Sequence, residues 1–158
     1  MKFFVQTTAA TPVKSRPIRG ASIALAAIFT AMVVAQLFTF EKFPEVIAVM
    51  GLPGDILVAD LRAALIVVFE VFALPFLLSM RLSPLMRIVS MVSGWIVAAA
   101  WLAVAIRLVA TGSDTDNGGL LGATVVLAPG VWMIVVCGLL VALVGYVSWG
   151  MWPRVRRK

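Results

Sequence analysis

The sequence has no histidine and only one cysteine, Cys137, among its 158 residues. Without an imidazole the chain cannot build the usual zinc and copper sites, a histidine-ligated haem or a histidine general base. A disulfide relay or a cysteine-ligated iron–sulfur cluster needs more than one thiol. We therefore expect no cofactor bound by His or Cys. A bound quinone is compatible with this composition, because its binding needs neither residue.

Charged residues are also scarce. They make up 13% of the chain, hydrophobic residues make up 63%, and the mean hydropathy is +1.10, against about 25% charged residues in a soluble domain. A helix needs ~20 apolar residues to cross the ~30 Å hydrocarbon layer. Four stretches meet this length, and we predict helices at about 18–40, 56–80, 85–110 and 130–150. Residues 120–128, which precede Pro129-Gly130, are predicted to form a short interfacial or re-entrant segment.

The positive charge is concentrated beside three helix ends. Cytoplasmic flanks retain Lys and Arg, and the two loops on the other side hold five acids against Lys42. We predict an all-α, multi-pass, up-down four-helix bundle in a bacterial-type inner membrane, with both termini cytoplasmic. Ten of the 13 basic residues lie in these three places: Lys2, Lys14, Arg16, Arg19, Arg81, Arg87, Arg154, Arg156, Arg157 and Lys158.

The predicted organisation is one transmembrane domain, residues 18–152, between a flexible basic tail at 1–17 and a basic tail at 153–158. The net charge of +6 then reflects topology and attraction to anionic headgroups of the lipid bilayer. A nucleic-acid partner is not expected, because the basic residues are divided among three membrane-flanking places and do not form one folded face.

Glu70 lies near the middle of the second apolar stretch. An ionised carboxylate facing lipid there would cost at least ~2.5 kcal/mol, so the side chain should face the bundle, be protonated, or both. Thr30 and Ser93 fall at a similar depth, and Pro75 leaves a backbone acceptor free close by. These groups predict an intramembrane polar site. The alternative is a structural hydrogen bond that fixes helix register.

A second group of charges is expected near the external surface, where it either pairs across helices or binds a polar ligand. Cys137 is interpreted as a packing residue in an apolar run. The five tryptophans are interpreted as interface anchors and packing residues. The external group comprises Glu41, Lys42, Asp60, Arg62 and Arg107, and the tryptophans are Trp95, Trp101, Trp132, Trp149 and Trp152.

Two segments resemble the DoxX-like and MauE-like family of integral membrane proteins. FTFEKFPEVIAVMGLP (38–53) resembles the end of that family's first helix and the stretch that follows it, and VVFEVFALPFLLSMRLSPLMR (67–87) resembles its second helix. The resemblance highlights Lys42, Pro53, Glu70 and Arg81. It implies an up-down four-helix bundle and a role in membrane-linked sulfur or redox metabolism.

Three functions follow as hypotheses. The first is a non-catalytic subunit or assembly factor of a membrane-associated redox complex, with other membrane or redox subunits as partners. The second is a small quinone-binding oxidoreductase in which Glu70 carries a proton and Thr30 or Ser93 orients it. The third is a transporter for a small solute or a proton, which at this size would act as an oligomer.

Overall fold

The computed structural model describes residues 13, 15–50, 52, 54–112 and 115–152. Within these residues it contains five helices and no strand, which confirms the all-α class. The expected tails, apart from residues 13 and 15–17, lie outside the described residues, as does Pro53. The helices are α1 (Arg16–Phe38), α2 (Phe43–Val49), α3 (Ile56–Leu77), α4 (Pro84–Thr111) and α5 (Val131–Met151).

Four of the helices overlap the four predicted stretches, with ends that differ by at most three residues. The first helix begins within the expected tail and ends before residue 40, and the short α2 was not predicted as a separate element. Local chemistry explains the starts. Asp55 and Ser83 accept hydrogen bonds from the backbone N–H groups of Val58 (3.2 Å) and Met86 (3.3 Å), so they cap α3 and α4. Proline also occupies the first turn of α2 and α4.

Three helices, α1, α4 and α5, are long and apolar enough to cross a membrane. Large apolar side chains are exposed on their outer faces, among them Val135, Leu139 and Trp149 of α5, which are 56–65% exposed. Such a surface is suited to lipid and not to water. The chain is therefore a membrane protein, as the composition predicted.

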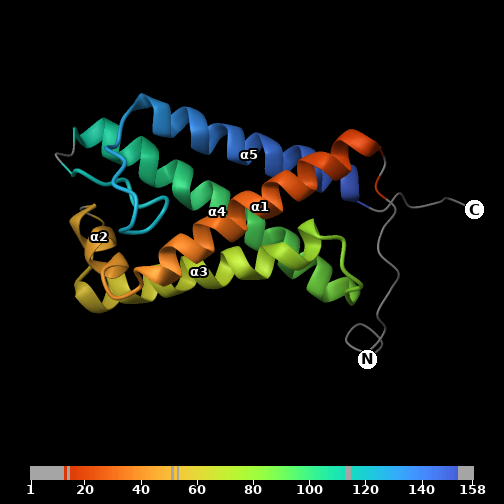
Figure 1. The fold of residues 1–158 in the computed structure, drawn as a ribbon, viewed down its shortest axis with the longest axis horizontal. Helices are drawn as coiled ribbons and strands as arrows, with labels where there is room; N and C mark the ends of the chain where they lie inside the picture. The colour runs from red at the N-terminus through yellow and green to blue at the C-terminus, as the bar shows by residue number, and fades with distance from the viewer. Residues whose placement is uncertain (1–12, 14, 51, 53, 113–114, 153–158) are drawn as a thin grey trace, which may run out of the picture.

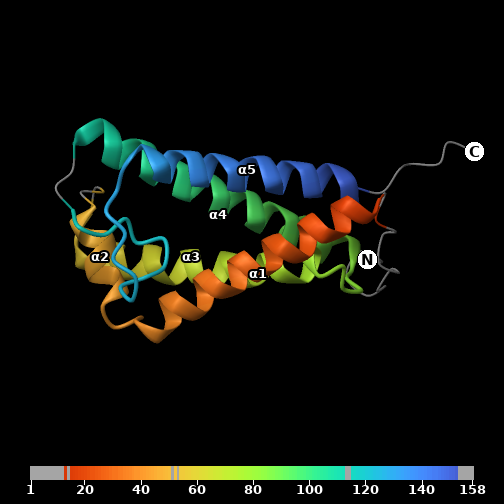
Figure 2. The ribbon, with the colours of Figure 1, turned by 45° about the horizontal axis from the view of Figure 1, so that its top comes forward.

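The four long helices lie side by side and alternate in direction, while α2 lies near the beginning of α3 (Figures 1 and 2). α3 packs against α4, α1 and α2, and α5 packs against α4 and α1. The beginning of α1 adjoins the end of α5. Gly150 of α5 lies so near Ile18 of α1 that an added Cβ would lie 2.5 Å from the Ile18 side chain.

Ser90 of α4 makes polar contacts with α3 around the proline inside that helix. Pro75 interrupts the helix bonding there, and the N–H of Phe76 donates to Ser90 Oγ of α4 at 2.9 Å. The Ser90 hydroxyl in turn donates to the carbonyl of Ala73 at 3.3 Å. Ser90 thus replaces part of the backbone bonding around Pro75 and joins α3 to α4.

The connection between α4 and α5, residues 115–130, folds back against the end of α1 (Figure 2). We call it the return loop. The N–H of Ala123 donates to Thr39 Oγ1 at 3.0 Å, and the Thr124 hydroxyl donates to the carbonyl of Ala35 at 3.4 Å. Residues 118–120 and 122 are buried. The segment 120–128, predicted as interfacial or re-entrant, consists of turns, a bend and irregular backbone, and contains no helix.

Candidate functional site

Glu70 is fully buried on α3, and one of its oxygens joins three helices. Glu70 Oε1 accepts a hydrogen bond from Gln36 Nε2 of α1 at 3.2 Å and another from Trp101 Nε1 of α4 at 3.2 Å. All three side chains are at most 1% exposed. The carboxyl group therefore faces the interior of the helix assembly and not the surrounding lipid, as its cost of exposure predicted.

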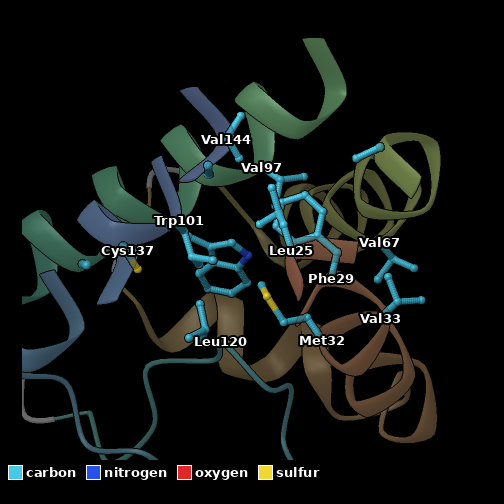
Figure 3. Packing of buried hydrophobic residues seen from close by; sticks show 14 of the residues in the cluster. Leu25, Phe29, Met32, Val33, Val67, Val97, Trp101, Leu120, Cys137 and Val144 are labelled. Carbon is cyan, nitrogen blue, oxygen red and sulfur yellow. The ribbon is translucent and has the colours of Figure 1, made fainter. Parts of the chain in front are cut away.

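Gln36 also joins the return loop to these helices. Its Nε2 donates a second bond to the backbone carbonyl of Leu120 at 3.3 Å, and Leu120 is itself buried. Figure 3 shows Leu120 and Met32 next to the indole ring of Trp101. We use the name polar centre for Gln36, Glu70, Trp101 and the Leu120 carbonyl, which belong to four different segments of the chain.

Two oxygens of the polar centre have no hydrogen-bond partner. These are Glu70 Oε2 and Gln36 Oε1, both of which are buried. Both donors to Glu70 are neutral groups, an amide and an indole. An ionised carboxylate in such surroundings is costly, because neutral donors compensate only part of the lost hydration. The centre therefore has spare capacity to accept a hydrogen bond.

The hydroxyls that were predicted to accompany Glu70 are bonded elsewhere. The Thr30 hydroxyl donates to the carbonyl of Ala26 at 2.8 Å, and the Ser93 hydroxyl donates to that of Val89 at 2.8 Å, each within its own helix. Thr30 is exposed, whereas Ser93 is buried. The structure thus brings Gln36 and Trp101 to Glu70 in place of these two hydroxyls.

Glu70 meets Gln36 instead of Thr30 because the end of α1 lies beside the middle of α3. The prediction placed residues by counting from helix ends that were taken to lie at equal depth. Between α1 and α3, however, the chain forms a turn and α2, which packs against α3. Gln36, near the end of α1, consequently lies level with the middle of α3.

Gln36 was missed because it lies near the end of its apolar stretch, where a polar side chain is cheap to keep. The sequence did contain an indication of its role, since Gln36 is the one amide side chain between residues 18 and 40. Trp101 was assigned to packing or to the interface. Its position well inside the third stretch was the clue that its N–H would need a partner within the protein.

A large apolar groove lies between α1 and α5, beside the return loop. Its volume is about 420 Å³. Leu120 belongs to both features, because its side chain lines the groove and its carbonyl accepts from Gln36. The groove therefore adjoins the polar centre. Its lining is Ile28, Ala31, Met32, Leu120, Leu121, Val136, Leu139, Leu140 and Leu143.

The predicted external charges all lie toward the end of the molecule that holds α2. Glu41 and Lys42 follow α1 and line a hollow of about 530 Å³ formed by residues 37–42. Asp60 and Arg62 lie in the first two turns of α3, and Arg107 lies close to the end of α4. These three do not line the hollow, so a joint ligand site stays a prediction.

Cys137 is fully buried in α5 among apolar core residues, consistent with packing. In the part of the chain that the structure describes, no group of three His, Cys, Asp or Glu side chains is placed to hold a metal ion.

Comparisons with protein-family models, curated proteins and solved structures give no match for this chain. The resemblance to DoxX-like proteins accordingly stays a prediction.

Proposed function

We propose that α1, α3, α4 and α5 all cross the membrane as an up-down four-helix bundle. α3 has 22 residues, which at 1.5 Å per residue gives ~33 Å, enough to span the hydrocarbon layer. Its charged side chains are compatible with a crossing. Asp60 and Arg62 lie in its first two turns, where charges can reach the membrane surface, and Glu70 is buried within the protein.

The proposed orientation places both ends of the bundle's chain in the cytoplasm of a bacterial-type cell. Arg16, Arg19 and Arg81 lie where α1 begins and α3 ends, and positive charge favours the cytoplasmic side. Reporter fusions after Lys158 and within the return loop at Asp116 test this topology. We expect the two reporters on opposite sides of the membrane, and finding them on the same side would overturn it.

The proposed function is that of a non-catalytic membrane subunit or assembly factor of a redox complex. The observation that carries it is the burial of Glu70 between helices. Glu70 is fully buried and bonded to two other helices, which is the arrangement expected of a group that fixes helix register. The resemblance of residues 38–53 and 67–87 to DoxX-like proteins supplies the link to redox metabolism.

Affinity purification in mild detergent, followed by mass spectrometry of proteins and lipids, tests this proposal. We expect co-purifying membrane or soluble subunits that carry a redox cofactor. Recovery of the chain alone at every expression level would contradict the proposal. Solute or proton flux in proteoliposomes of the purified chain would favour the transporter instead.

A second candidate, a small quinone-binding oxidoreductase, is favoured by the apolar groove. Its lining of aliphatic side chains suits the hydrocarbon tail of a quinone, and Leu120 connects it with the polar centre. In this role Glu70 would exchange a proton with the ring. Reduction of a quinone to a quinol takes two electrons and two protons, so the assay supplies an external two-electron reductant. Quinone reduction by the purified protein should then fall in Glu70→Gln and persist in Glu45→Gln, because Glu45 is exposed on α2. Unchanged activity in Glu70→Gln would remove Glu70 from the role.

A further inference from the structure

We propose that the polar centre is a binding site for one proton, held between Glu70 and Gln36, and that the bound proton fastens the return loop. Two oxygens of the polar centre are buried without a partner, Glu70 Oε2 and Gln36 Oε1. They belong to side chains that are already joined by one hydrogen bond of 3.2 Å.

A single proton satisfies both oxygens. When Glu70 is protonated on Oε2, that oxygen becomes a donor, while Gln36 Oε1 remains an acceptor. The terminal torsions of Glu and Gln are broad, so the two planar groups can turn to form a second bond. The result is a carboxylic acid–amide pair with two bonds, Gln36 Nε2–H to Glu70 Oε1 and Glu70 Oε2–H to Gln36 Oε1.

A water molecule could also donate to both oxygens, but it would leave the carboxylate charge uncompensated in a buried site. Cationic groups lie farther along the helices. Arg62 precedes Glu70 by eight residues on α3 (~12 Å), and Arg107 follows Trp101 by six on α4 (~9 Å). Among the described residues, the other charged groups toward this end of the molecule are exposed: Glu41 and Lys42 of the turn after α1, Glu45 of α2, Asp55 and Asp60 at the start of α3, and Asp116 of the return loop. The thiol of α5, Cys137, is buried. Between Arg19 and Phe38, α1 contributes no charged residue.

The proton reaches the return loop through Gln36. The same Nε2 that donates to Glu70 also donates to the Leu120 carbonyl, so the acid–amide pair fixes the orientation of this amide. When Glu70 loses its proton, the second bond of the pair is lost and the carboxylate competes for both N–H groups of Gln36. The bond to Leu120 weakens as a consequence, and the backbone of the return loop opens more often.

Infrared spectroscopy of the full chain in lipid nanodiscs tests the bound proton. A carboxylic acid C=O band at neutral pH that disappears when Glu70 is replaced belongs to the bound proton. We expect this band in the natural chain and in Glu45→Gln, a matched control on an exposed glutamate, and its loss in Glu70→Gln. Carboxylate bands alone in the natural chain at neutral pH would overturn the proposal.

Hydrogen–deuterium exchange of the return loop tests the coupling. The N–H groups of Gly118, Gly119 and Ala123 are hydrogen-bonded, to Leu127, Asn117 and Thr39. Once the pH is high enough to remove the acid band, their exchange should become about two- to tenfold faster beyond the intrinsic pH effect, as expected for one lost hydrogen bond. Gln36→Leu should give the faster exchange at both pH values. If the exchange rates of these three N–H groups, corrected for the intrinsic pH effect, stay the same after the acid band has disappeared, the coupling is wrong.

Discussion

The close approach of the return loop to α1 can be tested by adding one methyl group at Gly122. This glycine has φ +65°, and a Cβ built on it would lie 3.0 Å from the Ala35 carbonyl oxygen, 3.0 Å from Gln36 Cα and 2.8 Å from Thr39 Oγ1. The first two atoms belong to the backbone of α1, so they cannot turn aside as a flexible side chain would. Gly122→Ala must therefore shift the loop or strain the helix.

The expected cost has two parts. A left-handed backbone conformation costs a non-glycine residue about 1–2 kcal/mol, and overpacking a filled interior typically costs about 1–3 kcal/mol. Gly122→Ala should thus lower the free energy of unfolding by about 2–5 kcal/mol. A loop that lifts away to relieve the clash instead loses its bonds to Thr39 and Ala35, at a cost of about 1 kcal/mol each.

Two other glycines separate these contributions. Gly112 has φ +57° with no atom within 4 Å of an added Cβ, so Gly112→Ala should cost only the backbone part, about 1–2 kcal/mol. Gly20 is helical and equally open, so Gly20→Ala should stabilise by about 0.5–1 kcal/mol. The assay is unfolding in mixed detergent micelles, followed by circular dichroism. A Gly122→Ala variant no less stable than Gly112→Ala would refute the close packing of the loop.

The same assay checks three further substitutions. Ser90→Ala removes the acceptor of the Phe76 N–H and should destabilise by about 1–3 kcal/mol, whereas Ser93→Ala loses only a bond within its own helix and should cost less than about 1 kcal/mol. Equal losses for the two serines would contradict the role of Ser90 beside the proline. Trp101→Phe keeps an aromatic ring but removes the N–H donor to Glu70, so it should cost about 1 kcal/mol, and a neutral effect would argue against that bond.

Sequence reasoning found the helices because each signal was local. The long apolar stretches located the four long helices to within three residues at each end. The burial of Glu70 could also be predicted from its position alone, because a carboxyl group in the middle of an apolar stretch is costly to expose to lipid.

The partners of Glu70 could not be read from the sequence, because they depend on how far each helix slides along its neighbours. The turn and α2 between α1 and α3 bring Gln36 to the level of Glu70. The Leu120 carbonyl is a backbone group with no signal in residue type, and it lies 84 residues from Gln36 in sequence. Only the folded arrangement of four segments reveals that they meet.

That separation in sequence has a consequence for how the protein is made. Chains are synthesised and inserted from the N-terminus, so Gln36 enters the membrane before Glu70, Trp101 and Leu120 do. Glu70 follows before its indole partner, 31 residues later in the sequence, has entered. Both side chains must therefore pass through insertion with unsatisfied polar groups, sheltered by water, lipid headgroups or the insertion machinery. The last bond, from Gln36 to Leu120, closes only when the chain between α4 and α5 has emerged, which makes completion of the polar centre a late step in biogenesis.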